Sequence, residues 1–339
     1  MLLKPSSNRV VKPLPSQTRL AAKPAAMTVA GFAYALGMWF VAPPCIAANV
    51  AYVTNQGSQT VSVVDLESWT VTATIAVPGK PAGISLSPVR PEFYVTAPDA
   101  HDIAVIDQAS KTVIRRIQTG GGPVGIAAHP TSGLIYVADW YTHQIAVADP
   151  QTGAVLSRID VGQSPSGVAI TPDGSTILTA DRDSDAVSVI DAATNTRLAS
   201  IKVGARPFGI TLDAQGTRAF TANVGSDDVS VIDLITRSVI ATVAVGRRPY
   251  AVAVTSQQAF VTDQYGGTVT VFDLATMKPV KTIEACDHPE GINYDPVRNA
   301  VYIACWFDNT LIRIDATSLT VTGTVKVGDG PRAFGNFLR

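Results

Sequence analysis

The stretch YVTN at residues 52–55, followed by VSVVD at residues 61–65, decides the fold because this pair of segments recurs along the chain. Each second segment ends in an aspartate, and a proline follows that aspartate sixteen residues later. The closing aspartates are Asp65, Asp107, Asp149, Asp191, Asp233, Asp273 and Asp315, and the prolines are Pro81, Pro123, Pro165, Pro207, Pro249, Pro289 and Pro331. Successive aspartates are 42 residues apart, except for one step of 40. The chain therefore contains seven copies of one structural unit.

The segments of this unit have the composition and alternation of β-strands. They are rich in Val, Ile, Thr, Tyr and Phe, and Gly, Pro, Asn and Asp separate them. We label the strands of a unit A to D along the chain. The first unit predicts strand B at residues 51–55, strand C at 61–65 and strand D at 70–76, with strand A of the next unit at 82–87. Four-stranded units at this period are typical of a β-propeller. A linear solenoid is the alternative, and it would need atypical capping repeats.

The two ends of the repeat region favour a closed ring. The region begins near Asn49, directly at a strand B, and ends at residues 331–339, which have the pattern of a strand A with no strand after it. We expect this last strand to complete the first blade, because closure leaves no half-built blade with an exposed edge. The predicted fold is all-β: a seven-bladed β-propeller over residues 49–339, with four-stranded blades and the C-terminal strand closing the first one.

Residues 1–48 differ from the repeats and have the pattern of a signal peptide. They contain five basic and no acidic residues, an apolar run at about residues 25–41, and small residues before Asn49. An uncleaved membrane anchor is the alternative, because the apolar run is long for a signal peptide. We expect cleavage, and hence a periplasmic or secreted protein that has no membrane span after cleavage.

The charge balance disfavours nucleic acid as the main partner. The full chain has 26 basic and 27 acidic residues, so loss of the five basic residues before Asn49 leaves 21 against 27, a net charge of −6. Nucleic-acid-binding proteins usually carry a basic surface instead. We expect a monomer whose partner is a periplasmic protein or a small ligand.

Three segments resemble the YVTN-type β-propeller repeat: YVTN at residues 52–55, VSVID at 187–191 and VGARPFGI at 203–210. The resemblance extends over essentially all of residues 49–339, and the plan of the chain is similar to that of the YncE-like periplasmic propellers. Related propellers include the large subunits of quinoprotein amine dehydrogenases and proteins associated with PQQ-dependent oxidation. The resemblance implies the fold and leaves the activity open, because one fold carries many functions. The WD dipeptide of WD40 blades is absent from the matching positions.

The order of the strands predicts where a site lies. It brings the B–C loops and the D–A loops to one face, which we call the top face. The closing aspartates of strands C lie on the opposite, bottom face, where we expect them to accept hydrogen bonds from backbone N–H groups of turns. The top-face loops vary while the frame repeats, and loops on a rigid scaffold commonly carry binding sites.

Thirteen residues of the top-face loops are candidates for contact with a partner or ligand. They are Trp140, Tyr141, His143, Arg206, Phe208, Arg248, Tyr250, Tyr265, His288, Glu290, Trp306, Phe307 and Arg332. Trp140 and Trp306 occupy the same repeat position, and aromatic residues on an exposed rim suit a ligand or protein contact. Packing over neighbouring loops is the alternative for them. The charged residues beside the repeat proline would either clamp an anionic ligand or form ordinary ion pairs.

Cys286 and Cys305 both fall at the top of the seventh blade. One precedes strand A and the other ends the antiparallel strand B, so they are nearly opposite about a hairpin centred near residue 296. This placement predicts a disulfide, which an oxidising compartment permits. A metal site that combines Cys286, His288 and Cys305 with His143 is the alternative, and no metal is predicted. The sequence has no C-x-x-C-H haem motif.

The sequence lacks a G-x-S-x-G nucleophile elbow, a P-loop and an H-E-x-x-H motif. It therefore favours a non-catalytic binding or scaffold propeller without a cofactor, whose top face contacts a protein partner or a small ligand. The resemblance leaves two alternatives open. One is a redox-linked component, like an amine dehydrogenase subunit, whose partner carries the quinone. The other is single-stranded DNA binding, as in YncE-like proteins, which requires strong salt dependence.

Overall fold

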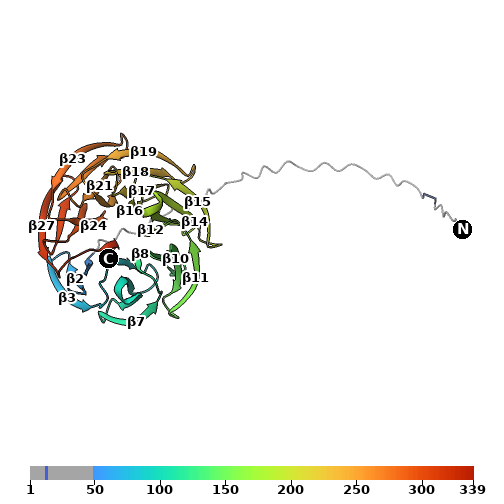
Figure 1. The fold of residues 1–339 in the computed structure, drawn as a ribbon, viewed down its shortest axis with the longest axis horizontal. Coiled ribbons are helices and arrows are strands. Elements are labelled where there is room, and N and C mark those ends of the chain that lie inside the picture. Colours follow the sequence, from blue (N-terminus) through green and yellow to red (C-terminus); the bar gives the residue numbers. More distant parts are fainter. Residues whose placement is uncertain (1–11, 14–48) are drawn as a thin grey trace, which may run out of the picture. The chain divides into compact units, whose positions relative to one another are not determined.

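The computed structural model describes residues 12–13 and 49–339, and residues 49–339 form seven β-sheets arranged in a ring (Figure 1). Each sheet is one blade, so the seven-bladed propeller predicted from the repeat is confirmed. The predicted signal peptide lies outside the described residues. Two short 3-10 helices, η1 (Pro98–Ala100) and η2 (Arg182–Ser184), interrupt the strands. No helix in the described part of the chain is long and apolar enough to cross a membrane.

Each blade runs from an innermost strand A beside the central channel to an outermost strand D. The A strands are β4 (Gly83–Leu86), β8 (Pro123–Ala128), β12 (Pro165–Ile170), β16 (Pro207–Leu212), β20 (Pro249–Val254), β24 (Pro289–Asp295) and β28 (Phe334–Asn336). The B strands are β1 (Val50–Asn55), β5 (Glu92–Ala97), β9 (Ile135–Asp139), β13 (Thr176–Asp181), β17 (Arg218–Asn223), β21 (Gln258–Asp263) and β25 (Ala300–Cys305). The C strands are β2 (Thr60–Asp65), β6 (Asp102–Asp107), β10 (Gln144–Asp149), β14 (Ala186–Asp191), β18 (Asp228–Asp233), β22 (Thr268–Asp273) and β26 (Thr310–Asp315). The D strands are β3 (Thr70–Ala76), β7 (Thr112–Gln118), β11 (Ala154–Asp160), β15 (Thr196–Lys202), β19 (Ser238–Ala244), β23 (Lys278–Glu284) and β27 (Thr320–Lys326).

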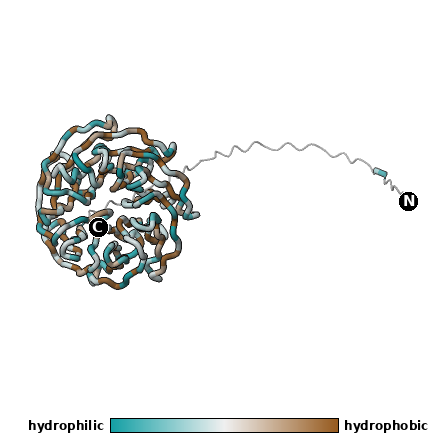
Figure 2. The backbone as a smooth tube through the Cα atoms, in the orientation of Figure 1, coloured by the Kyte–Doolittle hydropathy of each residue, from teal (hydrophilic) through white to brown (hydrophobic). Residues whose placement is uncertain are grey.

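The core of the protein lies between neighbouring blades. The B and C strands are buried almost throughout, because a blade packs on each of their faces, whereas the D strands expose alternate residues. The largest cluster joins blades seven, one and two, and in it the rings of Tyr52 and Phe93 are 4.3 Å apart. Figure 2 shows that hydrophobic residues are distributed over every blade rather than gathered in one centre. Each blade is therefore stabilised chiefly by its neighbours.

Small residues let the inner strands approach one another around the channel. Most of the repeat prolines are followed two residues later by a glycine, as at Gly125 in β8. A Cβ atom at Gly125 would overlap the carbonyl oxygen of Ser166 in the next blade. A side chain there would push the two inner strands apart, so the glycine sets the width of the channel at this level.

The C-terminal segment closes the ring at blade one and also pairs with blade two. Its two ends form antiparallel bridges to β1, Asn55 to Pro331 and Ala51 to Leu338, so it fills the inner position of blade one as predicted. Its middle, β28, also pairs in parallel with β4. This second pairing was not predicted, and it depends on Gly335, where a Cβ atom would overlap the carbonyl oxygen of Ile84.

The closing aspartates accept hydrogen bonds in the bottom-face turns, as the sequence predicts. The Oδ1 atom of Asp65 accepts the backbone N–H groups of Glu67 and Ser68 at 3.0 and 2.7 Å. Asp273 accepts the N–H groups of Ala275 and Thr276 in the same way. These hydrogen bonds lower the pKa of each aspartate, the largest contribution coming from the N–H group three residues later.

We expect Phe337→Ala to destabilise the protein by about 3–5 kcal/mol, because it removes a fully buried ring from the cluster that closes the ring of blades. The matched control is Ile235→Ala, whose side chain is 83% exposed and which we expect to change stability by less than about 0.5 kcal/mol. Denaturant unfolding measures both. Equal effects of the two substitutions would contradict the closure described above.

Candidate functional site

Side chains from four neighbouring inner strands and from three B–C loops gather at the top end of the channel. We call this group the mouth cluster, and it comprises Trp140, Phe208, Tyr250, Gln264, Glu290, Trp306, Arg332 and Phe334. Phe208, Tyr250, Glu290 and Arg332 each follow the repeat proline of their own blade. Equivalent positions in consecutive blades converge at the axis, so the repeat itself brings these side chains together.

A buried ion pair lies in the mouth cluster. The Nε atom of Arg332 is 3.4 Å from Oε2 of Glu290, and Arg332 Nη1 donates to the hydroxyl of Tyr250 at 3.2 Å. The amide of Gln264 donates to Oε1 of Glu290 at 2.6 Å. Burial raises the pKa of Glu290, and the charge of Arg332 opposes that rise. Of the two roles considered for these charged residues, the structure shows Arg332 and Glu290 as an ion pair with each other.

Three aromatic rings form a plug directly beside this ion pair. The ring of Phe208 is 4.7 Å from Tyr250 and 5.0 Å from Phe334, and the Tyr250 and Phe334 rings are 5.5 Å apart. Burial also raises the pKa of the Tyr250 hydroxyl, so the phenol is neutral. These contacts pack the three rings together at the top end of the channel.

Both candidate tryptophans have packing partners in the mouth cluster. The guanidinium of Arg332 lies over the Trp306 ring at 4.7 Å, and that of Arg182 lies over the Trp140 ring at 5.5 Å. The Trp140 ring is also 6.3 Å from Phe208. Both indoles are half-buried. Trp140 and Trp306 therefore pack on neighbouring side chains, and each keeps part of its surface exposed.

A second group of candidates forms a row across the top of blades six and seven. We call Arg248, Tyr265, His288 and Phe307 the rim ladder. Arg248 lies over the Tyr265 ring at 4.4 Å, Tyr265 is 5.2 Å from the His288 ring, and His288 is 4.6 Å from Phe307. Tyr265 is 49% exposed and Phe307 is 59% exposed. This group presents aromatic and cationic surface to solvent.

The other three candidates lie outside both groups. The Nδ1 atom of His143 accepts the backbone N–H of Ser164 at 3.0 Å. Asp185 and Asp227 accept equivalent N–H groups from Arg206 and Arg248 at the same repeat position, so His143 serves a turn of the frame. The Arg206 side chain is exposed. Tyr141 is 72% exposed and lies beside Gly122.

Buried carboxyl groups hold the D–A loops in place by accepting hydrogen bonds from their backbone N–H groups. Asp181 Oδ2 accepts the N–H of Gly162 at 3.0 Å, and Asp263 Oδ1 accepts that of Gly246 at 3.0 Å. Burial raises the pKa of both aspartates to about 6. Asn223 occupies the same position in blade five, where its amide donates to Ser230 Oγ at 2.9 Å. The repeat thus tolerates either an acid or an amide at this position.

In blade seven a disulfide replaces this contact. Cys305 stands where Asp263 stands in blade six, Cys286 stands where Gly246 stands, and their sulfur atoms are bonded at 2.04 Å. The predicted disulfide is confirmed, and the competing metal site loses two of its ligands. No cluster of metal-binding side chains occurs among the residues that the structure describes. Because Cys286 precedes His288 by two residues and Cys305 immediately precedes Trp306, the bond anchors parts of both the rim ladder and the mouth cluster.

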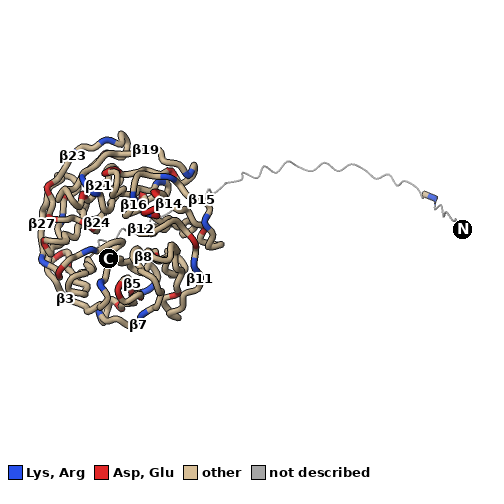
Figure 3. The backbone as a smooth tube through the Cα atoms, viewed as in Figure 1, with Lys and Arg blue, Asp and Glu red and all other residues tan. Residues whose placement is uncertain are grey.

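The list of candidates from the sequence lacks two members of these groups, Gln264 and Phe334. Gln264 shares the repeat position of Trp140 and Trp306, so the repeat predicts its place at the mouth. Phe334 has no such signal in the sequence. Figure 3 shows β8 and β12, at the centre of the ring, without charged residues.

Comparison with known proteins places the chain among propellers. Residues 131–299 match the family of YNCE-like beta-propellers, and residues 21–171 match the cytochrome D1 heme domain. Comparison with curated proteins gives no match.

Three solved structures show the same fold. Hydrazine synthase of Kuenenia stuttgartiensis has a TM-score of 0.69 at 21% identity, over 76% of this chain and 89% of that chain. A functionally unknown protein from Desulfotomaculum acetoxidans has a TM-score of 0.73 at 16% identity, over 84% and 99%. The dihydro-heme d1 dehydrogenase NirN, in complex with DHE, has a TM-score of 0.62 at 15% identity, over 86% and 75%. At these identities the similarity concerns the fold.

The substitution Asp263→Asn should stabilise the protein at pH 7.5. In the folded protein the pKa of Asp263 is about 6, which is above its ordinary value near 4. The protonated carboxyl group therefore favours folding, and its whole contribution to the free energy of unfolding is present below pH 4. This contribution is lost as the pH rises through 6. Asparagine cannot ionise, and its amide can donate to Thr270 Oγ1, which Asp263 now contacts at 2.7 Å. We expect a gain of about 1–2 kcal/mol at pH 7.5 and convergence with the wild type near pH 4, measured by denaturant unfolding.

The control for this substitution is Asp273→Asn in the same blade. Hydrogen bonds lower the pKa of Asp273, so its charged form favours folding and its replacement should lower stability at pH 7.5. Destabilisation of both variants at pH 7.5 would show that Asp263 is not held in an unfavourable ionised state.

The double variant Cys286→Ser with Cys305→Ser should lose about 2–4 kcal/mol, the range typical of a native disulfide. The double variant Cys286→Gly with Cys305→Asp introduces the pair that blade six uses at Gly246 and Asp263, and it should recover part of this loss. Thermal unfolding with and without reductant measures the set, and only the wild type should respond to reductant. A Gly and Asp variant no more stable than the Ser variant would refute the equivalence of the two contacts.

Proposed function

This chain belongs to the YNCE-like β-propellers, and from that premise we propose that it is a non-catalytic component of a periplasmic redox system that binds a partner protein through its top face. The match of residues 21–171 to the cytochrome D1 heme domain supports a redox-linked role over a scaffold with no redox role. Two proteins of similar fold, hydrazine synthase and a dihydro-heme d1 dehydrogenase, support the same role.

The described residues offer no histidine, cysteine or methionine to ligate a haem in the channel of this chain. A protein-held haem needs an axial ligand such as imidazole, thiolate or thioether that faces a cavity. His101, His129 and His143 contact backbone groups through ring nitrogens, and His288 pairs with Asp287 on the rim. The two described cysteines form the disulfide, and no histidine, cysteine or methionine lines the channel cavity. The proposal therefore assigns the redox group to the partner.

The rim ladder is the observation that supports partner binding most directly. Tyr, Arg and Trp side chains dominate the energetics of protein interfaces, especially where they are held in place before binding. The ladder stacks such side chains in a fixed row, and the disulfide anchors the loop that carries His288. The plug within the mouth cluster packs three aromatic rings together at the top of the channel, which disfavours entry of a small ligand from this side. A protein surface is thus the better-matched occupant of the top face.

The experiment is to isolate the tagged full-length protein from the periplasm of its native host and to measure its complexes by native mass spectrometry and absorption spectroscopy. We expect a stoichiometric partner whose spectrum carries the redox group, and we expect Tyr265→Ala with Phe307→Ala to weaken the complex at least about tenfold. Ile235→Ala, on an exposed bottom-face turn, is the control and should leave the complex unchanged.

Three results would overturn the proposal. The first is a haem bound stoichiometrically by this chain alone. The second is a complex that survives the double substitution unchanged. The third is strong binding of single-stranded DNA that weakens steeply with salt, which would favour the nucleic-acid alternative instead.

A further inference from the structure

A separate cavity lies in the channel below the aromatic plug. It has a volume of about 460 Å³, and inner strands from all seven blades line it. Phe334 of the plug is part of its lining, as are Pro88, Pro130 and Pro172 of the A–B turns. The cavity therefore extends from Phe334 of the plug to the A–B turns of the bottom face, away from the rim ladder. Its volume falls in the range of small-molecule sites.

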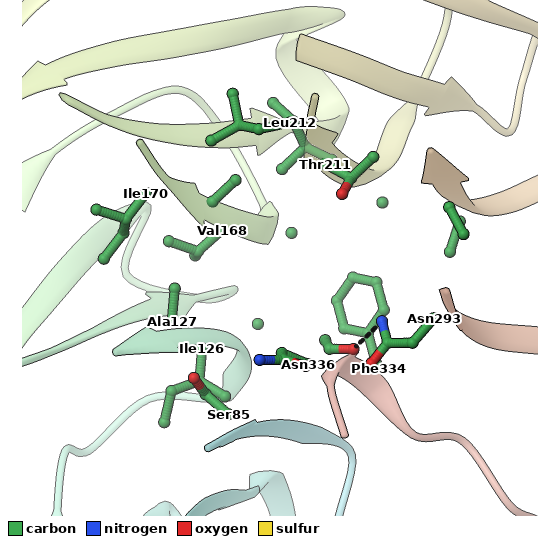
Figure 4. A pocket seen from close by; sticks show the side chains of 18 of the residues that line it. Ser85, Ile126, Ala127, Val168, Ile170, Thr211, Leu212, Asn293, Phe334 and Asn336 are labelled. Atoms are coloured by element: carbon green, nitrogen blue, oxygen red, sulfur yellow. Dashed lines mark hydrogen bonds between the residues drawn. The ribbon is translucent and has the colours of Figure 1, made fainter. Parts of the chain in front are cut away.

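The lining of the cavity is uncharged and has two different sides. No charged side chain contributes to it, among the residues that the structure describes. Figure 4 shows Val168, Ile170 and Leu212 on one side, and Asn293 and Asn336 on another. The first side comes from blades four and five, and the second from the seam between blades seven and one. An occupant would meet an apolar wall and a carboxamide-bearing wall at once.

Asn336 is the exception at its repeat position. Five residues after the repeat proline the other blades have Leu86, Ala128, Ile170, Leu212, Val254 and Tyr294. Asn293, by contrast, is occupied, because it donates to the carbonyl of Gly335 at 3.0 Å and accepts the N–H of Phe337 at 2.8 Å. The carboxamide of Asn336 is exposed and makes no hydrogen bond to any described residue. It offers a free donor and a free acceptor to the cavity.

We propose that this cavity binds an uncharged small molecule that has an aromatic or aliphatic body and one carbonyl or hydroxyl group. The body packs against Val168, Ile170 and Leu212, and the polar group bonds to the Asn336 carboxamide. A charged ligand is excluded because no lining side chain compensates the loss of its hydration. Access is from the bottom face, so binding is independent of a partner on the top face.

The test uses three probes with one ring system: 2-naphthol, naphthalene and 2-naphthoate. Calorimetric titration or ligand-detected NMR with the full-length protein should show saturable 1:1 binding of 2-naphthol and at least about tenfold weaker binding of the anionic 2-naphthoate. Asn336→Leu introduces the residue that blades two and five have at this position, so the strand should fold as before. This substitution should weaken the binding of 2-naphthol about tenfold and leave the affinity for naphthalene unchanged, because only the hydroxyl of 2-naphthol bonds to the carboxamide.

A second variant guards against a general effect on the channel. Val168→Phe narrows the apolar side and should weaken 2-naphthol and naphthalene together. The proposal is wrong if 2-naphthol does not bind saturably, if 2-naphthoate binds as tightly, or if Asn336→Leu affects both neutral probes equally. None of these outcomes bears on the partner complex of the top face, which Tyr265 and Phe307 test separately.

Discussion

The backbone pairing between residues 331–339 and strand β1 is the constraint on which the rest of the molecule depends. Tyr52 donates to the carbonyl of Phe337 at 2.9 Å, and Arg332 donates to the carbonyl of Thr54 at 2.8 Å. Without this segment blade one would have three strands, with an open inner edge beside the channel. The pairing joins the two ends of the repeat region, so every blade gains a neighbour on each side.

The same segment supplies the distinctive side chains of the channel. Arg332 forms the buried pair with Glu290, Phe334 belongs to the plug, and Asn336 bears the unpaired carboxamide of the cavity. One segment therefore both closes the ring and contributes to the mouth cluster and the cavity. Because the plug separates the mouth from the cavity, the top face and the bottom face can serve different partners without sharing a ligand.

The repeat period made most of the fold predictable from the sequence. The spacing of aspartates and prolines fixed the blades, and the antiparallel positions of Cys286 and Cys305 indicated their disulfide. The parallel pairing of β28 with β4 was not predictable, because it depends on a close approach that only Gly335 permits.

The sequence predicts which face carries the candidate site, but it does not predict how the side chains of that face are arranged. Variation among the repeats indicated both His143 and Phe307 as candidates for binding. In the structure His143 accepts a hydrogen bond in a turn, whereas Phe307 is exposed to solvent. Nothing in the pattern separated the mouth cluster from the rim ladder, since that division depends on which side chains reach the axis. The repeat alone shows that Asn336 differs from the residues at the same position in the other blades. Only the structure shows that this residue lines the cavity.

Amide hydrogen exchange in β1 tests the closure of the ring most directly. The N–H groups of Val50 and Tyr52 face the C-terminal segment, at 2.9 Å from the carbonyls of Arg339 and Phe337. The account predicts that both exchange as slowly as the amides of β2, which lies inside blade one. Exchange of Val50 and Tyr52 at the rate of an amide that makes no hydrogen bond would contradict it.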